Sequence, residues 1–357
     1  MFRNFAILLN VLALTTLVMI HFSSGINPLD FWPFAFLGLV YPLILISCVF
    51  FALFWLFGKL KAVSVLFLFA LILTWSSNEA SFQMSIPSET LNEISLMSWN
   101  VKNFDLYNWS GNENSRNEML KLLEEERPNI LCLQEFYTED KGKFTNLKEI
   151  KNNLDYKHHY FAETYSIDGN RHWGMIIFSD YKIINTGKLT FKKGTRLNTC
   201  MYVDIALSET QAARVYNVHF QSNQFSEEDY NFLDNLNEQE SGYSAMNIVN
   251  KLKTGYMNRA EQVQQVLESK TQSPYPTIIC GDFNDTPVSY AYKTLSQGMQ
   301  DAFIEKGIGF GKTYVNPTPF LRIDFSLFHP MFTINGYEKV SEIELSDHYP
   351  IRARFTY

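Results

Sequence analysis

Charged side chains are almost absent from the first eighty residues. The charge-free runs 4–29, 31–58 and 62–78 are interrupted only by Asp30 and by Lys59-Leu60-Lys61. A helix needs about 20 apolar residues to cross the hydrocarbon core, so the runs predict three transmembrane helices, the third one short. A buried hairpin of a soluble protein is the alternative, but these runs offer no polar face to water. Residues 1–78 are therefore expected to form a membrane anchor, and transport is disfavoured because the runs contain no charged side chain to line a path.

The few basic residues in this part predict its orientation. Arg3 precedes the first run, the loop at 23–33 has no Lys or Arg, and Lys59 and Lys61 lie between the second and third runs. Because positive loops stay in the cytoplasm, we expect an integral protein of the cytoplasmic (inner) membrane whose later residues lie on the non-cytoplasmic side. A cleaved signal peptide would leave that side unchanged. A third segment that fails to cross would reverse it.

Cysteine is also scarce, with four residues in 357, which excludes a disulfide scaffold. Residues 79–93 are polar and predict a linker. Residues 94–357 alternate strand-like and helical patterns, which indicates an α/β fold with two packed sheets. Its cysteines, Cys132, Cys200 and Cys280, lie in apolar runs and are expected to be buried thiols. From residue 81 onward, 27 basic and 35 acidic residues give a net charge of −8, which is poor for non-specific gripping of duplex DNA.

Several catalytic motifs are missing. The chain has no Cys/His set for structural zinc, no H-E-x-x-H, no P-loop and no G-x-S-x-G, which disfavours zinc proteases, P-loop enzymes and serine hydrolases. Instead, polar residues recur where apolar runs end or in the later loops. They are Asn100, Glu135, His219, Asp282, Asn284, Asp324, Asp347 and His348. One such acid could cap a turn, but a recurring set of carboxylates at buried strand ends is costly without a bound cation.

The residue types of this set indicate a hard metal and phosphate chemistry. Glu135 and Asp347 are oxygen ligands suited to Mg²⁺ or Mn²⁺, with Asn100 and water completing the shell. Histidines beside acids and a divalent metal fit the hydrolysis of a phosphate ester. Asp282 is the candidate for activating water, and His348 could be oriented by an acid.

The order of six motifs resembles the endonuclease/exonuclease/phosphatase, DNase I-like family over residues 94–357. The motifs are W-N (99–100), L-Q-E (133–135), N-V-H (217–219), G-D-F-N-D-T-P (281–287), R-I-D-F (322–325) and S-D-H-Y-P-I (346–351). The resemblance implies a four-layered α/β sandwich with the site at one edge of the two sheets.

The same resemblance implies roles for the residues that match its motifs. Glu135 would be the main metal ligand, with Asn100 and Asp347 beside it. Asp282 and Asn284 would position the attacking water and the phosphate. His219 would contact the phosphate and could act as a general acid. His348 would be the histidine of the S-D-H motif, and Asp324 would orient it.

The substrate is left open between three classes. The first is nucleic acid, cleaved by a metal-dependent phosphodiesterase or nuclease. The second is a lipid or small-molecule phosphodiester or phosphate, as in sphingomyelinases, which the anchor and the net charge favour. The third is a non-catalytic interaction module, disfavoured because every candidate position holds a workable residue. No obligatory protein partner is inferred.

Three further positions carry two interpretations each. Arg259 is either a charge on a helix surface or a site-facing arginine. Thr313 and Tyr314 lie in a Gly- and Pro-rich loop that either touches substrate or connects elements at the surface.

Overall fold

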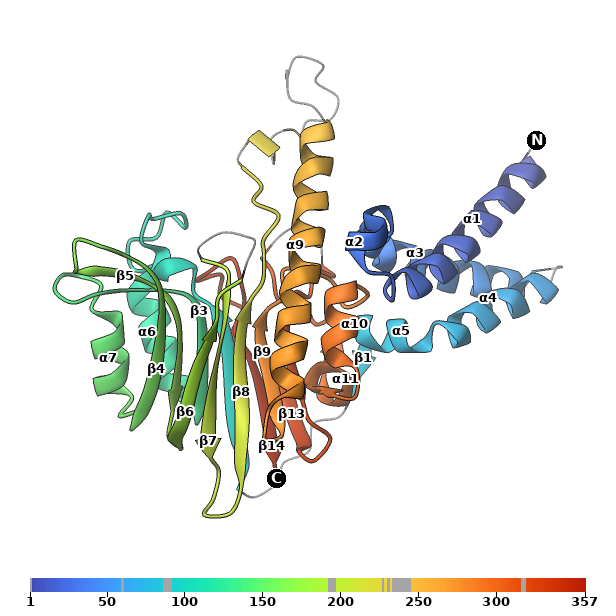
Figure 1. The fold of residues 1–357 in the computed structure, drawn as a ribbon. Helices are drawn as coiled ribbons and strands as arrows, with labels where there is room; N and C mark the ends of the chain where they lie inside the picture. Colours follow the sequence, from blue (N-terminus) through green and yellow to red (C-terminus); the bar gives the residue numbers. More distant parts are fainter. Residues whose placement is uncertain are drawn as a thin grey trace.

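The computed structural model describes residues 2–58, 61–85, 92–191, 197–226, 228–229, 232, 245–315 and 319–357. Figure 1 shows a helical N-terminal part beside an α/β part. The N-terminal helices are α1 (Phe2–Ser23), α2 (Pro28–Phe31), η1 (Trp32–Phe36), α3 (Leu37–Leu56), α4 (Lys61–Leu73) and α5 (Trp75–Ser81). Leu17, Tyr41 and Phe67 belong to one apolar cluster that joins α1, α3 and α4. Many of the large apolar side chains on the outside of these helices are exposed, which is unusual for a surface that faces water.

The prediction of three membrane-crossing helices is not supported. Within the described residues, one segment, Pro28–Leu56, is long and apolar enough to cross a membrane by length and composition. α4 has only 13 residues and meets α5 at an angle of 73°, so the two count as a second span only if the bent pair is taken as one. The apolar stretch of α1, Ile7–Ser23, is shorter than a span. The length of a charge-free run therefore overestimated the length of straight apolar helix, because the absence of charge does not show where a helix bends.

Two six-stranded sheets form the α/β part. The strand orders are β13-β14-β2-β3-β5-β4 and β10-β12-β9-β8-β7-β6. The pairs β2–β3 and β8–β9 are parallel, and the other pairs within these sheets are antiparallel. The bounds in the first sheet are β2 (Ile94–Asn100), β3 (Ile130–Glu139), β4 (His158–Ile167), β5 (Arg171–Ser179), β13 (Thr333–Lys339) and β14 (Ile351–Thr356). Those in the second are β6 (Lys182–Leu189), β7 (Thr199–Ala206), β8 (Ala212–His219), β9 (Thr277–Asp282), β10 (Gln300–Asp301) and β12 (Asp324–Phe328).

Both faces of each sheet are covered, which gives four layers. α6 (Ser115–Glu126) and α7 (Asn146–Asn153) cover the outer face of the first sheet, while α9 (Ala245–Thr271) and α10 (Tyr290–Ser296) cover that of the second. Along β3, Cys132 points into the core between the sheets, whereas Leu131 and Leu133 pack under α6. In β9, Cys280 is likewise in the inner core and Ile279 lies under α9. Strands that are buried on both faces have continuous apolar runs, as β3 and β9 do. The two covered sheets confirm the predicted two-sheet α/β sandwich.

Part of the predicted linker is folded. Residues 75–81 are α5, and β1 (Gln83–Met84) pairs with β11 (Ile308–Gly309), which follows α11 (Ala302–Lys306). The Arg322 guanidinium donates to the carbonyl of Ala80 at 2.7 Å, so this segment makes a specific contact with the α/β part. Residues 86–91 of the predicted linker lie outside the described residues.

The N-terminal helices also contact the face formed by α9 and α10. The Phe36 ring of η1 lies 5.5 Å from the Tyr256 ring of α9, and Lys293 of α10 donates to the Ser24 hydroxyl at 3.2 Å. Val288 packs into the apolar cluster of α1, α3 and α4. In Figure 1 these helices project from the side of the sandwich opposite α6 and α7. All four cysteines are buried free thiols, as expected for the three in the α/β part.

Candidate active site

Four strand ends bring the predicted polar residues together. Asn100 ends β2, His219 ends β8, Asp282 ends β9, and Asp324 begins β12. His219 and Asp324 are the two strand neighbours of Asp282 in the second sheet. Since β2 and β3 are parallel to each other, as are β8 and β9, their carboxyl ends meet at one edge of each sheet. The site is therefore a product of the sheet topology.

Glu135 reaches the site from inside β3 through a bulge. The register of β3 with β5 shifts between Leu133 and Phe136, and Glu135 has φ +48°. A bulge of this kind re-aims one side chain of a strand. The Glu135 carboxylate accepts a hydrogen bond from the Asn100 amide at 3.2 Å, and the same amide donates to Asp282 at 3.2 Å. Burial and the nearby Asp347 raise the pKa of Glu135.

The turn after β9 fixes the Asp282 carboxylate. Gly281 has φ +131°, and a Cβ there would lie 2.1 Å from the Val218 carbonyl oxygen, so glycine is required. The Asn284 backbone N–H donates to Asp282 Oδ1 at 2.7 Å, and its side-chain amide donates to Asp282 Oδ2 at 3.1 Å. Burial, with a further contribution from Asp324, raises the pKa of Asp282 to about 6. This carboxylate is thus held in place and ionised at neutral pH.

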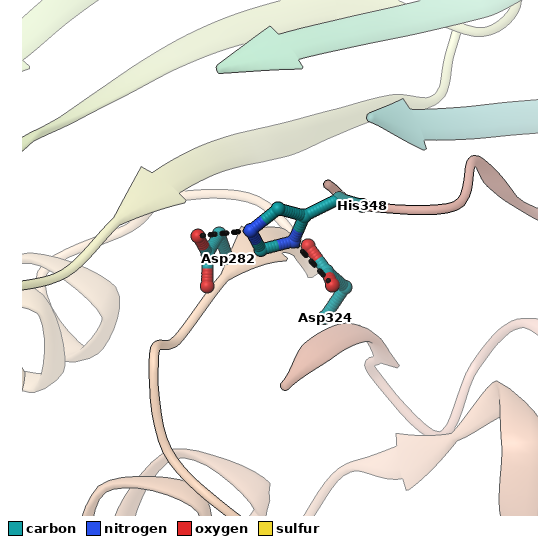
Figure 2. A group of neighbouring side chains, drawn as sticks. All are labelled: Asp282, Asp324 and His348. Carbon is teal, nitrogen blue, oxygen red and sulfur yellow. Dashed lines mark hydrogen bonds and ion pairs between the residues drawn. The ribbon is translucent and has the colours of Figure 1, made fainter. Parts of the chain in front are cut away.

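His348 lies between two carboxylates (Figure 2). Its Nδ1 is 2.9 Å from Asp324 Oδ2, and its Nε2 is 3.5 Å from Asp282 Oδ2. Burial by itself would lower the pKa of His348, but Asp324 and Asp282 raise it to about 10. His348 is therefore a cation at neutral pH, oriented by Asp324 and facing Asp282.

His219 differs from His348 in its protonation. Its Nε2 lies 3.5 Å from Glu135 Oε1 and 3.8 Å from Asp282 Oδ2. Burial, together with the charge of His348, lowers the pKa of His219, despite the opposing effect of Asp282. A neutral imidazole beside acids can bind a phosphate oxygen through its N–H or transfer a proton.

Two groups of residues could hold a metal ion. Asp282, Asp324 and His348 offer ligand atoms within 4.8 Å of one another. His348 is protonated there and has both nitrogens directed at carboxylates, so it is a poor ligand. Glu135 and Asp347 are partly exposed oxygen donors close enough to repel each other, which fits a hard divalent cation. In this structure the Asn100 oxygen accepts from the Lys102 N–H at 3.1 Å, so Asn100 positions the acids rather than facing that space with its oxygen.

All eight predicted site residues therefore lie in one cluster. The three positions with two interpretations, Arg259, Thr313 and Tyr314, lie outside this set and make the contacts that follow. Arg259 is neither a surface charge nor a site residue: it is buried and pairs with Asp285, three residues after Asp282, at 3.0 Å. The Thr313 hydroxyl is buried and accepts a hydrogen bond from the Asp324 N–H at 3.1 Å, which fixes the backbone of Asp324. The Tyr314 ring meets His348 edge-on at 5.0 Å.

Lys102 is a site residue that the motifs did not reveal. Its ammonium lies 3.1 Å from Asp347 Oδ2. The only sequence signal was its position two residues after Asn100. A lysine after a strand is common, and nothing in its neighbours separates it from an ordinary surface lysine.

Sequence models identify relatives of both parts. The model of the Endonuclease/Exonuclease/phosphatase family matches residues 97–348, and that of a domain of unknown function matches residues 3–80. No curated protein matches the chain.

Solved structures share the fold of the larger part. One is a functionally unknown conserved protein from Enterococcus faecalis V583, with 15% identity, a TM-score of 0.54, and 74% of this chain and 99% of that chain covered. A second is an endonuclease/exonuclease/phosphatase family protein from Bacteroides thetaiotaomicron, with 16% identity, a TM-score of 0.53, and 75% and 98% covered. A third is humanized D. rerio TDP2, with 18% identity, a TM-score of 0.51, and 74% and 99% covered. At these identities the likeness concerns the fold alone.

Proposed function

Because this chain belongs to the endonuclease/exonuclease/phosphatase family, we propose that it is a metal-dependent phosphodiesterase that acts on nucleic acid. The observation that carries the proposal is the Asp282 carboxylate, which is fixed by Asn284 and flanked by the His348 cation. This arrangement suits the activation of water for attack on a phosphate.

We assign one residue to each part of the proposed reaction. Asp282, ionised above pH 6, accepts the proton of the attacking water. The His348 cation, held by Asp324, stabilises negative charge beside Asp282. His219 donates a hydrogen bond to a phosphate oxygen from the other side of Asp282.

Glu135 and Asp347 would hold the divalent ion, Mg²⁺ or Mn²⁺. When bound, such an ion polarises the phosphoryl oxygen and offsets the charge that develops there. The cluster contains four carboxylates, those of Glu135, Asp282, Asp324 and Asp347. In the contacts described above, the cations beside them are Lys102 and His348. Burial is the larger cause of the raised pKa of Glu135, and a cation held by Glu135 and Asp347 would relieve the repulsion from Asp347 that adds to it.

Hydrolysis should depend completely on the metal. We expect the full chain in detergent with Mg²⁺ to cleave single-stranded and plasmid DNA, to lose this activity in EDTA, and to recover it on addition of Mg²⁺ or Mn²⁺. The measurement is the rate of phosphodiester cleavage by gel assay. Activity that persists in EDTA would contradict the metal dependence.

A lipid phosphodiester is the second candidate substrate, and one observation favours it. The apolar outer surface of α1, α3 and α4 lies in the same chain as the site, so a membrane would bring lipid headgroups to the enzyme. Sphingomyelin vesicles in parallel with DNA separate the two. Headgroup release without DNA cleavage would replace nucleic acid by lipid as the substrate.

We further propose that the N-terminal helices anchor the catalytic part to a membrane, with Pro28–Leu56 as the principal span. The N-terminal end of α1 and the start of α4 at Lys61 lie at the end of the helices away from the sandwich (Figure 1). Arg3 is in the first turn of α1. By the positive-inside preference, that end is cytoplasmic and the catalytic part is not. A reporter that functions only outside the cytoplasm, fused after residue 357, should be active. Activity of only the cytoplasmic reporter would overturn this orientation.

A further inference from the structure

The segment that follows β2 has an unusual backbone beside the site. Lys102, Asn103, Phe104 and Asp105 in η2 (Lys102–Asp105) all have φ between +42° and +55°. Residues with a side chain rarely adopt this left-handed conformation even singly, and four in succession are costly. The buried Phe104 ring, 5.4 Å from the Phe136 ring, anchors the turn in the core. Strain of this kind persists where packing imposes it, and here it sets the direction of the next residues.

The strained turn places a cation and two aromatic rings at the rim of the acidic cluster. Lys102 Nζ lies 3.1 Å from Asp347 Oδ2 and 5.1 Å from the centre of the Trp109 ring. Trp109 is 50% exposed and Tyr107 is 61% exposed, and their ring centres are 4.9 Å apart. The Ser110 N–H donates to Asp105 Oδ1 at 3.2 Å, which ties the end of this segment back to its start. Lys102 thus connects the aromatic pair to a carboxylate of the site.

We propose that Lys102, Tyr107 and Trp109 form a subsite for a nucleotide next to the scissile phosphate. Trp109 and Tyr107 stack against its base, and the Lys102 ammonium binds a phosphate oxygen of the same strand. Aromatic stacking suits nucleic acid of any sequence, because every base has a flat π-face. This inference rests on the proposed function, since it names the part of the chain that recognises the substrate of that same site.

The position of the segment favours a nucleotide over a lipid surface. Exposed aromatic pairs also occur where proteins enter a bilayer interface. The Lys102–Ser110 segment leads into α6, which lies on the side of the sandwich opposite the N-terminal helices (Figure 1). A membrane around those helices would therefore lie on the side of the sandwich away from α6. A soluble strand that lies across the site can contact both the aromatic pair and Asp282.

The test compares two oligonucleotides that share their phosphodiester backbone. One is a single-stranded DNA oligonucleotide, and the other carries abasic tetrahydrofuran sites in place of its nucleosides. With the full chain in detergent and saturating Mg²⁺, we expect Trp109→Ala to raise KM for the base-bearing strand about tenfold, with kcat nearly unchanged. KM for the abasic strand should not move. Trp109→Phe, which keeps an aromatic face, should recover most of the affinity.

Tyr357→Ala is the matched control. Tyr357 is 48% exposed and follows the end of β14, whereas His348 of the site precedes the start of that strand. It should leave both KM values unchanged. If the wild-type chain cleaves DNA and Trp109→Ala raises neither KM or raises both equally, the subsite is refuted while the proposed function stands. If the wild-type chain cleaves lipid diesters and neither oligonucleotide, both proposals fail.

Discussion

Replacement of Asp282 by Asn is expected to lower kcat for phosphodiester cleavage by about 10²–10⁴-fold, the usual contribution of a general base. The substitution keeps the size of the side chain and its contact with the Asn284 N–H, but removes the proton acceptor that faces His348. Loss of a buried charge near three other acids should not unfold the chain. The measurement is kcat at pH 8 with saturating Mg²⁺, beside the midpoint of thermal unfolding.

The pH profile gives an independent check of the same residue. The pKa of Asp282 is raised to about 6, so the wild-type rate should fall as the pH drops through 6 and the base is protonated. The Asn variant should lack this acidic limb. Asp168→Asn, an exposed acid in the turn between β4 and β5 that pairs with Arg171, is the matched control and should behave as wild type. A wild-type rate in Asp282→Asn would refute the role given to Asp282.

The catalytic cluster could be predicted from the sequence because its residues stand at strand ends. Asn100, His219 and Asp282 each end an apolar run, and short runs of this kind are typical of strands in a sheet covered on both faces. Parallel neighbours then bring these ends to one edge. The loop residues Asp347 and His348 do not end a strand, and they entered the set through their residue types and the order of the motifs.

Other features of the site and the fold depend on tertiary contacts that the sequence alone does not reveal. Arg259 has the same local sequence whether it faces water or Asp285, and only the packing of α9 against the second sheet decides between them. Lys102 and Trp109 are joined to the site by a left-handed turn, which the propensities of its residues would not predict. The bend between α4 and α5 likewise arises within the charge-free run 62–78, whose lack of charge gives no sign of it.

Replacement of Asp324 by Asn is expected to lower kcat by about 100-fold and to change the alkaline side of the pH profile. Asp324 accepts a hydrogen bond from His348 Nδ1 at 2.9 Å and, after burial, is the foremost influence on the pKa of His348, which it helps to raise to about 10. Without that carboxylate the pKa of His348 falls, so the imidazole loses its proton at a lower pH. The wild-type rate should be sustained up to about pH 10. That of the variant should decline from a lower pH.

A double variant separates this role from a merely structural one. If Asp324 acts through His348, then Asp324→Asn combined with His348→Gln should be hardly slower than His348→Gln alone, because the second change removes a support that is no longer used. Asp180→Asn, which loosens the partly exposed pair with Arg127, is the control for loss of an acid elsewhere and should leave kcat unchanged. Fully multiplicative losses in the double variant would show that Asp324 and His348 act separately, and the orienting role of Asp324 would have to be abandoned.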